Sequence, residues 1–197
     1  QRSDFSVISV WAYNNNGDWF WVDGVCRRQL MDRNLADLFR LVQIYRPEQV
    51  GIEVSGQQGG FIPWIEDQMI VKNTFFNLAS DYNENRPGIR PNTNKMQRFN
   101  VVVPWFKAKK MYFPIEKKND LEMQECMNEL SLTSMSGFKS KHDDFIDTIS
   151  MLANLKVWKP SLNTEMARGD PNSEESDIWE LVDDNDAEES RLSRYTV

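Results

Sequence analysis

An apolar stripe that directly follows a cluster of acidic residues, near residue 145, constrains the fold of this chain more than any other feature. The stripe recurs at helical spacing and predicts a core-facing helix that begins after Gly137 and ends near Trp158. A helix with this pattern buries one face against the rest of its domain. Its apolar members are Phe145, Ile146, Ile149, Met151, Leu152 and Leu155.

Three carboxylates lie at the start of this predicted helix. Asp144 and Asp147 are three residues apart and share one face, whereas Asp143 points about 100° away by the helical period. Carboxylates are favoured near a helix N-terminus, so capping explains one of the three. Hard oxygen ligands gathered within one turn also suit Mg²⁺ or Mn²⁺, which makes all three candidate metal ligands and catalytic residues.

The N-terminal third predicts a hairpin, a helix and a strand in that order. Residues 5–13 and 19–25 are β-branched and aromatic, with turn chemistry between them. A helical period covers residues 35–45, and residues 49–54 form a short apolar strand with Glu53 at its carboxyl end. Ligands of open α/β sheets bind at the carboxyl ends of parallel strands, so Glu53 is a further candidate for the acidic site.

Helices and strands also alternate in the middle of the chain. Residues 61–71 and 95–103 are predicted helices. Residues 74–79 and 109–115 are predicted strands, and Pro114 places the second of them on a sheet edge. Together with the hairpin, this order predicts an α/β domain with a mixed sheet, in which an antiparallel hairpin joins parallel strands and helices flank both.

Two further segments complete the predicted domain. Residues 81–94 are rich in Asn, Pro and Gly and are expected to form a mobile surface loop. Residues 120–132 are predicted to form an amphipathic helix. Its expected inward side chains are Leu121, Cys126, Met127 and Leu130.

The net charge of −7 is unevenly distributed. Residues 161–197 contain eleven Asp or Glu against three Lys or Arg, which leaves twenty basic against nineteen acidic residues in residues 1–160. We therefore expect one domain over residues 1–160, followed by a flexible, mostly disordered acidic tail over residues 161–197. The tail contains one apolar island, Ile178, Trp179, Leu181 and Val182, which could dock as a short helix or strand.

Basic residues of the expected domain concentrate between Arg86 and Lys110. Such a concentration is a candidate surface for nucleic-acid phosphates. A solvated edge is the alternative, because edge strands often carry Lys to prevent aggregation. The candidate DNA contacts are Lys95, Arg98, Lys107, Lys109 and Lys110.

Composition argues against several other classes of protein. No run approaches eighteen apolar residues, and the start of the chain lacks a signal-peptide layout, so we expect neither a membrane span nor secretion. Cys26 and Cys126 have no CxxC partner, which favours two buried free thiols over a disulfide scaffold or a zinc site. The seven Trp residues are expected in core and hairpin packing rather than in base stacking.

Five short segments occur in the order found in the C-terminal nuclease domain of tailed-phage large terminase subunits, which this chain resembles over about residues 1–160. They read DFSVI at residues 4–8, IEVSG at 52–56, KMQRF at 95–99, MYFP at 111–114 and HDDFID at 142–147. The resemblance implies a ribonuclease H-like fold and an endonuclease that uses two Mg²⁺ or Mn²⁺ ions to cut concatemeric viral double-stranded DNA during genome packaging. By the same resemblance, Glu53 matches the second family acid and Asp144 or Asp143 the third, with Asp147 as a further candidate.

The resemblance also implies partners and a location. Double-stranded DNA, the terminase ATPase domain, the portal and the small terminase subunit are the implied partners, in the cytoplasm of the infected host cell. No ATP-binding motif of the GxxxxGK[ST] type is present, so only the nuclease half of such a subunit is expected here.

One family feature has no match in this sequence. The first catalytic Asp of the family lies on a strand just before the segment that matches residues 4–8, upstream of Gln1. We expect either that the chain is trimmed at a domain boundary, which is the favoured reading, or that Asp4 substitutes. In the trimmed case, the first strand of the sheet and one metal ligand would lie upstream, and the isolated chain should bind metal poorly and be only weakly active.

Two alternative functions and one ambiguous residue stay open. A non-catalytic assembly module that docks other packaging proteins would use the same scaffold, and so would a structure-selective resolvase. His142, the single histidine, is either a surface or capping side chain, or a proton carrier or outer metal ligand.

Overall fold

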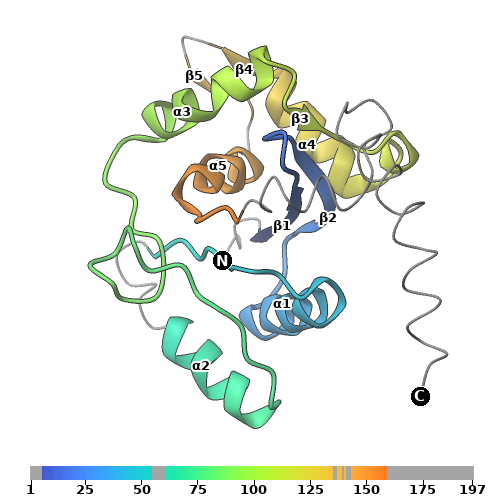
Figure 1. The fold of residues 1–197 in the computed structure, drawn as a ribbon. Helices are drawn as coiled ribbons and strands as arrows, with labels where there is room; N and C mark the ends of the chain where they lie inside the picture. The colour runs from blue at the N-terminus through green and yellow to red at the C-terminus, as the bar shows by residue number, and fades with distance from the viewer. Residues whose placement is uncertain (1–5, 55–60, 135–136, 139, 141–142, 159–197) are drawn as a thin grey trace, which may run out of the picture. The chain divides into compact units, whose positions relative to one another are not determined.

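The described part of the chain combines five α-helices with a mixed three-stranded sheet (Figure 1). The computed structural model describes residues 6–54, 61–134, 137–138, 140 and 143–158. The predicted acidic tail, residues 161–197, lies outside these residues. Among the described residues, no helix has the length and apolar content needed to cross a bilayer.

The sheet is built on the predicted hairpin, which is confirmed. Strands β1 (Ser6–Tyr13) and β2 (Trp19–Arg27) pair antiparallel, with a register shift between Val10 and Trp11. Gly17 turns the chain between them with a positive φ of 80°, which glycine adopts without steric cost.

The third strand, β3 (Met111–Tyr112), pairs parallel with β2 on the sheet edge. Its edge position was predicted, but its predicted extent over residues 109–115 is wrong. Lys109 turns the chain with a positive φ of 56°, and Pro114 leads into the short 3-10 helix η2 (Ile115–Lys117). Of the four residues between these two positions, only Met111 and Tyr112 pair with β2.

Helices flank the sheet in two separate apolar cores. Helices α1 (Met31–Tyr45) and α2 (Phe61–Val71), both predicted, share a core that the β1 residue Ile8 also contacts. The other core joins α3 (Lys95–Lys107), α4 (Leu121–Ser131) and α5 (Asp144–Met151), and it includes the β1 residues Val7 and Trp11. Successive strand residues point to opposite faces, so β1 separates the two cores. Trp19 and Trp21 are buried in the second core, as expected for packing residues.

The predicted strands over residues 49–54 and 74–79 form single parallel bridges instead of a ladder. Val50 pairs with Leu78, and Glu53 pairs with Ile89. The partner changes from residue 78 to residue 89 within three residues, so neither pairing continues long enough to make a strand. Ile89 belongs to the predicted surface loop and is buried, which corrects that part of the prediction.

Helix α3 (Lys95–Lys107) is longer than the predicted residues 95–103 and continues through Pro104. Helix α4 (Leu121–Ser131) has the predicted extent but a different inward face. Leu121 is 75% exposed and Met127 is 37% exposed, so both were wrongly predicted to face the core. The buried residues of α4 are Met123, Cys126 and Glu129, which recur every three residues.

Helix α5 (Asp144–Met151) ends earlier than predicted and continues as the 3-10 helix η3 (Leu152–Asn154). It also begins later than expected, because β4 (Thr133–Ser134) and β5 (Gly137–Phe138) form a small antiparallel pair before it. The apolar stripe was predicted correctly, since the side chains of Phe145, Ile146 and Ile149 are almost completely buried.

Cys26 on β2 and Cys126 on α4 are both free and buried, as predicted. Burial raises the pKa of the Cys26 thiol to about 12 and that of Cys126 well above its ordinary value. Neither thiol has the depressed pKa of a reactive cysteine.

Candidate functional site

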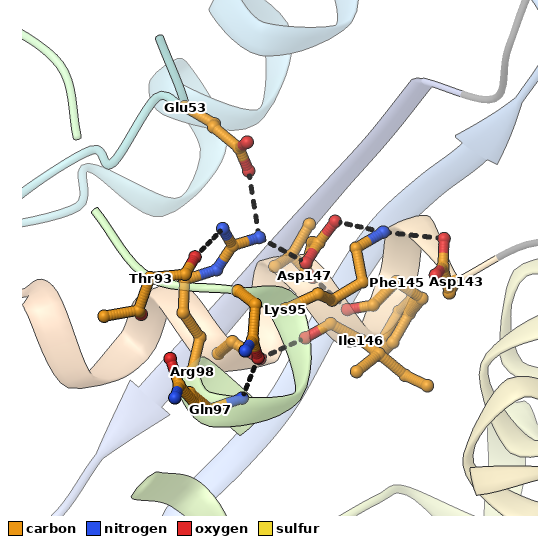
Figure 2. Close-up of polar contacts among 12 residues, drawn as sticks. Glu53, Thr93, Lys95, Gln97, Arg98, Asp143, Phe145, Ile146 and Asp147 are labelled. Carbon is orange, nitrogen blue, oxygen red and sulfur yellow. Dashed lines mark hydrogen bonds and ion pairs between the residues drawn. The ribbon is translucent and has the colours of Figure 1, made fainter. Parts of the chain in front are cut away.

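The candidate site forms where the first turn of α3 meets the first turn of α5. The Asn94 side chain accepts the backbone N–H of Gln97 at 2.8 Å and so caps the start of α3. Lys95 and Arg98 are three residues apart in this first turn, so they lie on the same helical face. That face is directed toward the carboxylates of α5 (Figure 2).

Two basic side chains bind the acidic first turn of α5. Lys95 Nζ lies 2.7 Å from Asp143 Oδ1 and 2.6 Å from Asp147 Oδ2. Arg98 Nη2 lies 2.8 Å from Asp147 Oδ1, so both oxygens of Asp147 contact a cation. Although burial alone would lower the pKa of Lys95, its hydrogen bonds to Asp143 and Asp147 raise it above its ordinary value.

Glu53 faces the same group of charges from residues 50–54. Its Oε2 lies 4.0 Å from Arg98 Nη2 (Figure 2). The bridge to Ile89 fixes its backbone. Burial raises the pKa of Glu53, the negative charge of Asp147 raises it further, and the charges of Arg98 and Lys95 oppose the shift. Glu53 and Asp147, which are far apart in sequence, therefore interact electrostatically in the folded chain.

A buried carboxylate from α4, which sequence reasoning missed, caps α5. Glu129 Oε2 accepts the backbone N–H groups of Phe145 at 2.9 Å and Ile146 at 3.1 Å. Asp143 occupies the N-cap position but makes no capping hydrogen bond with its side chain. Capping therefore does not account for the Asp143 carboxylate, which instead contacts Lys95. The signal in the sequence was the three-residue spacing of Met123, Cys126 and Glu129, which places an acid on the buried face.

Two hydroxyl groups, also missed, tie α5 to β1 beside the acids. Ser9 Oγ donates to Thr148 Oγ1 at 2.9 Å, and Thr148 Oγ1 donates to the carbonyl of Phe145 at 2.8 Å. Trp11 Nε1 donates to Ser9 Oγ at 3.1 Å. These bonds orient the first turn of α5 relative to the sheet.

A cavity of about 460 Å³ lies beside these groups. Glu53, Asp144 and Asp147 all line it. The negative charge of Asp144 also contributes to raising the pKa of Glu53. Three of the four selected acids therefore line one cavity, and the fourth, Asp143, shares the Lys95 ammonium with Asp147.

The candidate DNA contacts do not form one free basic surface. Lys95 and Arg98 are held by the acids, and Lys110 Nζ lies 2.8 Å from Asp18 and donates to the carbonyl of Asn16. Lys107 and Lys109 are exposed near the end of α3. The remaining two candidates, Asp4 and His142, lie outside the described residues.

The donor chemistry fits a hard divalent cation, because carboxylate oxygens from Asp143 and Asp147 already converge on the Lys95 ammonium. Within the described ranges, no three Asp, Glu, His or Cys side chains lie close enough together to hold a metal ion by themselves. The site instead contains pairs of carboxylates that converge on one cation: Asp143 and Asp147 on Lys95, and Glu53 and Asp147 on Arg98.

Comparison of the sequence with protein-family models and with curated proteins gives no match.

Proposed function

We propose that this chain is a Mg²⁺- or Mn²⁺-dependent endonuclease that cleaves double-stranded DNA, corresponding to the nuclease domain of a tailed-phage large terminase subunit. The observation that carries the proposal is that Glu53 and Asp147, from separate elements, both face Arg98 Nη2, at 4.0 Å and 2.8 Å, and line one cavity. The five segments shared in order with that family support the same reaction.

The converging oxygens of Asp143 and Asp147 would hold a metal ion, with Glu53 and Asp144, which line the adjacent cavity, as further candidate ligands. Bound divalent ions activate water and stabilise the leaving oxygen in phosphodiester hydrolysis. The residues of the chain position these groups. Arg98 orients the carboxylate of Asp147, and the exposed Lys107 and Lys109 are available to contact DNA phosphates.

The test is cleavage of supercoiled plasmid DNA with and without Mn²⁺. We expect Mn²⁺-dependent nicking by the wild-type chain and at least about a hundredfold less with Glu53→Gln or Asp147→Asn, as for the loss of a major catalytic group. Glu122→Gln and Asp81→Asn are matched controls. These acids form ion pairs with Arg27 and Lys156 elsewhere on the surface.

The two alternatives are separated by the same assay. Absence of cleavage with Mg²⁺ and with Mn²⁺, by this chain and by a longer polypeptide that supplies the first catalytic Asp, would leave the non-catalytic assembly module. Strong preference for four-way junctions over linear duplex would identify a resolvase. The portal, small terminase subunit and ATPase domain are proposed partners if the chain is either the terminase nuclease or the assembly module.

We propose also that the sheet is ribonuclease H-like and that the cavity takes a further β-strand between β1 and residues 49–53. Unbroken runs from both segments, residues 6–11 and 49–53, line the cavity. Because alternate residues of a strand face opposite sides, unbroken runs mean that the cavity borders strand edges rather than one face. In the described sheet, β1 lies at the end and pairs with β2 alone.

The backbone of residues 50–54 supports this strand position. Val50, Ile52 and Val54 direct their backbone hydrogen bonds to residues 77–79 and 89. By strand alternation, Gly51 and Glu53 direct theirs to the opposite side. Helix α1 supplies a mostly apolar wall, whereas α5 supplies Asp144, Asp147 and Thr148, so the occupant should be apolar toward α1 and polar toward the start of α5.

In the resembling family, the first catalytic Asp lies on a strand just before the segment that matches residues 4–8, and we propose that strand as the occupant. The test is amide hydrogen exchange at Gly51 and Glu53. In a longer polypeptide that includes such a strand, both amides should exchange at least about tenfold more slowly than in the present chain. Equal exchange rates would contradict the proposed strand.

A further inference from the structure

The Lys95 ammonium occupies the point where two candidate metal ligands converge. Its Nζ lies 2.7 Å from Asp143 Oδ1 and 2.6 Å from Asp147 Oδ2, with Arg98 on the other oxygen of Asp147 (Figure 2). The concentration of basic residues between Arg86 and Lys110 predicted a DNA contact for Lys95. The contacts of its ammonium with Asp143 and Asp147 indicate a different role.

The position of Lys95 is built into the fold rather than left to a flexible surface chain. Lys95 begins α3, whose start is capped by Asn94, and its side chain is only 29% exposed. Two carboxylates on one ammonium satisfy much of its hydrogen-bonding capacity. A solvated lysine of the kind found on sheet edges would not be enclosed in this way.

A divalent ion and this ammonium need the same oxygen lone pairs. Mg²⁺ binds carboxylate oxygens at about 2.1 Å and leaves no room for a second cation on the same side of the ligand. The Lys95 charge would also repel a divalent ion across a few ångströms of partly buried protein, where screening by solvent is weak.

We propose that Lys95 is a built-in competitor for the divalent ion: it holds Asp143 and Asp147 until a metal ion displaces it, and the released ammonium then binds a nucleic-acid phosphate. The inference rests on the proposed function, because it assigns the displaced cation a role at the same site. Lys95 thereby couples metal binding to DNA binding. A phosphate that accepts the ammonium removes the competitor, so DNA tightens metal binding and the metal tightens DNA binding by the same factor.

The first experiment measures Mn²⁺ affinity by isothermal titration calorimetry, without DNA. Lys95→Met should bind Mn²⁺ roughly three- to tenfold more tightly than wild type, the range expected when an ion pair of about 1 kcal/mol no longer competes. Lys95→Arg keeps the charge and should stay close to wild type. Lys156→Met is the matched control, since Lys156 pairs with Asp81 on an exposed surface.

The outcomes separate this inference from the proposed function. If Lys95→Met and a second variant, Lys95→Gln, bind Mn²⁺ no more tightly than wild type while remaining folded by circular dichroism, the competitor role is overturned. If wild type and both variants all fail to bind Mn²⁺, the metal-dependent function fails together with it. Tighter binding by the variants upholds the inference even where plasmid cleavage is absent.

The second experiment measures coupling with Ca²⁺, which replaces Mn²⁺ to limit cleavage of the DNA. A short duplex should tighten Ca²⁺ binding to the wild-type chain several-fold, and Lys95→Met should lose most of that effect. Equal coupling in both proteins would contradict the transfer of Lys95 from carboxylate to phosphate.

Discussion

The carboxylate of Glu129 accepts the backbone N–H of Phe145 at 2.9 Å, so a side chain of α4 caps the helix that carries the candidate site. This bond explains why Asp143, at the N-cap position, can direct its carboxylate to Lys95. The backbone at the start of α5 is therefore bound by a side chain of α4, while Lys95 and Arg98 from α3 bind its carboxylates.

The first prediction concerns the pH dependence of stability. Burial raises the pKa of Glu129 to about 7, against hydrogen bonds from Ile146 and Phe145 that oppose the shift. The ordinary value is 4.5. Because the pKa of Glu129 is higher in the folded chain than in the unfolded chain, its protonation stabilises the fold. This contribution is complete below about pH 4.5 and is lost as the pH rises through about 7. The loss is on the order of 3 kcal/mol in the free energy of unfolding.

Urea unfolding of wild type and Glu129→Gln between about pH 4.5 and 8 checks this prediction. The variant cannot ionise and keeps an oxygen acceptor, so its free energy of unfolding should fall less as the pH rises. Glu122→Gln, at a partly buried acid of the same helix that pairs with Arg27, serves as the control. Identical pH profiles for wild type and Glu129→Gln would rule out the assigned role.

The second prediction concerns Gly88, which precedes the bridge between Ile89 and Glu53. Its φ is +107°, and an added Cβ would lie 2.7 Å from Val54 Cγ1. Gly88→Ala should lower the free energy of unfolding by about 2 kcal/mol or more, with a fall in Tm of several degrees. Thermal unfolding followed by circular dichroism is the measurement.

Gly137→Ala is a matched control for Gly88→Ala. Gly137 also has a positive φ, +134°, but a Cβ there would meet nothing within 4 Å. The difference between the two variants isolates the steric clash from the backbone strain. Equal destabilisation would mean that Val54 moves aside without cost.

The third prediction concerns the exposed basic residues at the end of α3. If Lys107 and Lys109 contact phosphates, changing both to Ala should reduce the slope of log affinity against log salt by nearly two units, at about 0.9 per contact. Lys110→Ala should change it less, because Lys110 is bound to Asp18. Fluorescence anisotropy with a labelled duplex over a salt series is the measurement. An unchanged slope in the double variant would return both residues to a solvated edge.

The fourth prediction concerns the acidic sequence of residues 161–197. If it is flexible, its eleven carboxylates are tethered at a local concentration in the millimolar range and compete with DNA for basic side chains. Removal of residues 161–197 should tighten DNA binding at low salt and have little effect at physiological salt, where the Debye length is about 8 Å. Equal affinities of both chains at both salt concentrations would leave docking through Trp179 and its apolar neighbours as the alternative role.

Local patterns in the sequence predicted much of the fold. The hairpin, α1, α2 and the buried stripe of α5 follow from side-chain period and turn chemistry, which are local properties. The extent of the pairing at residues 49–54 was not predictable in this way. It depends on whether residues 78 and 89, which are distant in sequence, continue alongside.

The candidate site was predicted as a set of residues but not as an arrangement. The acids Glu53, Asp143, Asp144 and Asp147 could be selected by residue type and position. The pairing of Lys95 with two of them could not, because it depends on the packing of α3 against α5. For Glu129, the three-residue spacing on α4 indicates burial, but its partners could not be predicted because they are backbone N–H groups sixteen and seventeen residues away.

The two buried cysteines can report how often the packing of α4 against the sheet opens. Thiol reagents attack the thiolate, and burial raises the pKa of both thiols and shields both sulfur atoms in the closed chain. Cys26 lies on β2 and Cys126 on α4, the helix that also supplies Glu129. The rate at which an alkylating reagent labels these thiols in native buffer therefore measures how often α4 separates from the sheet.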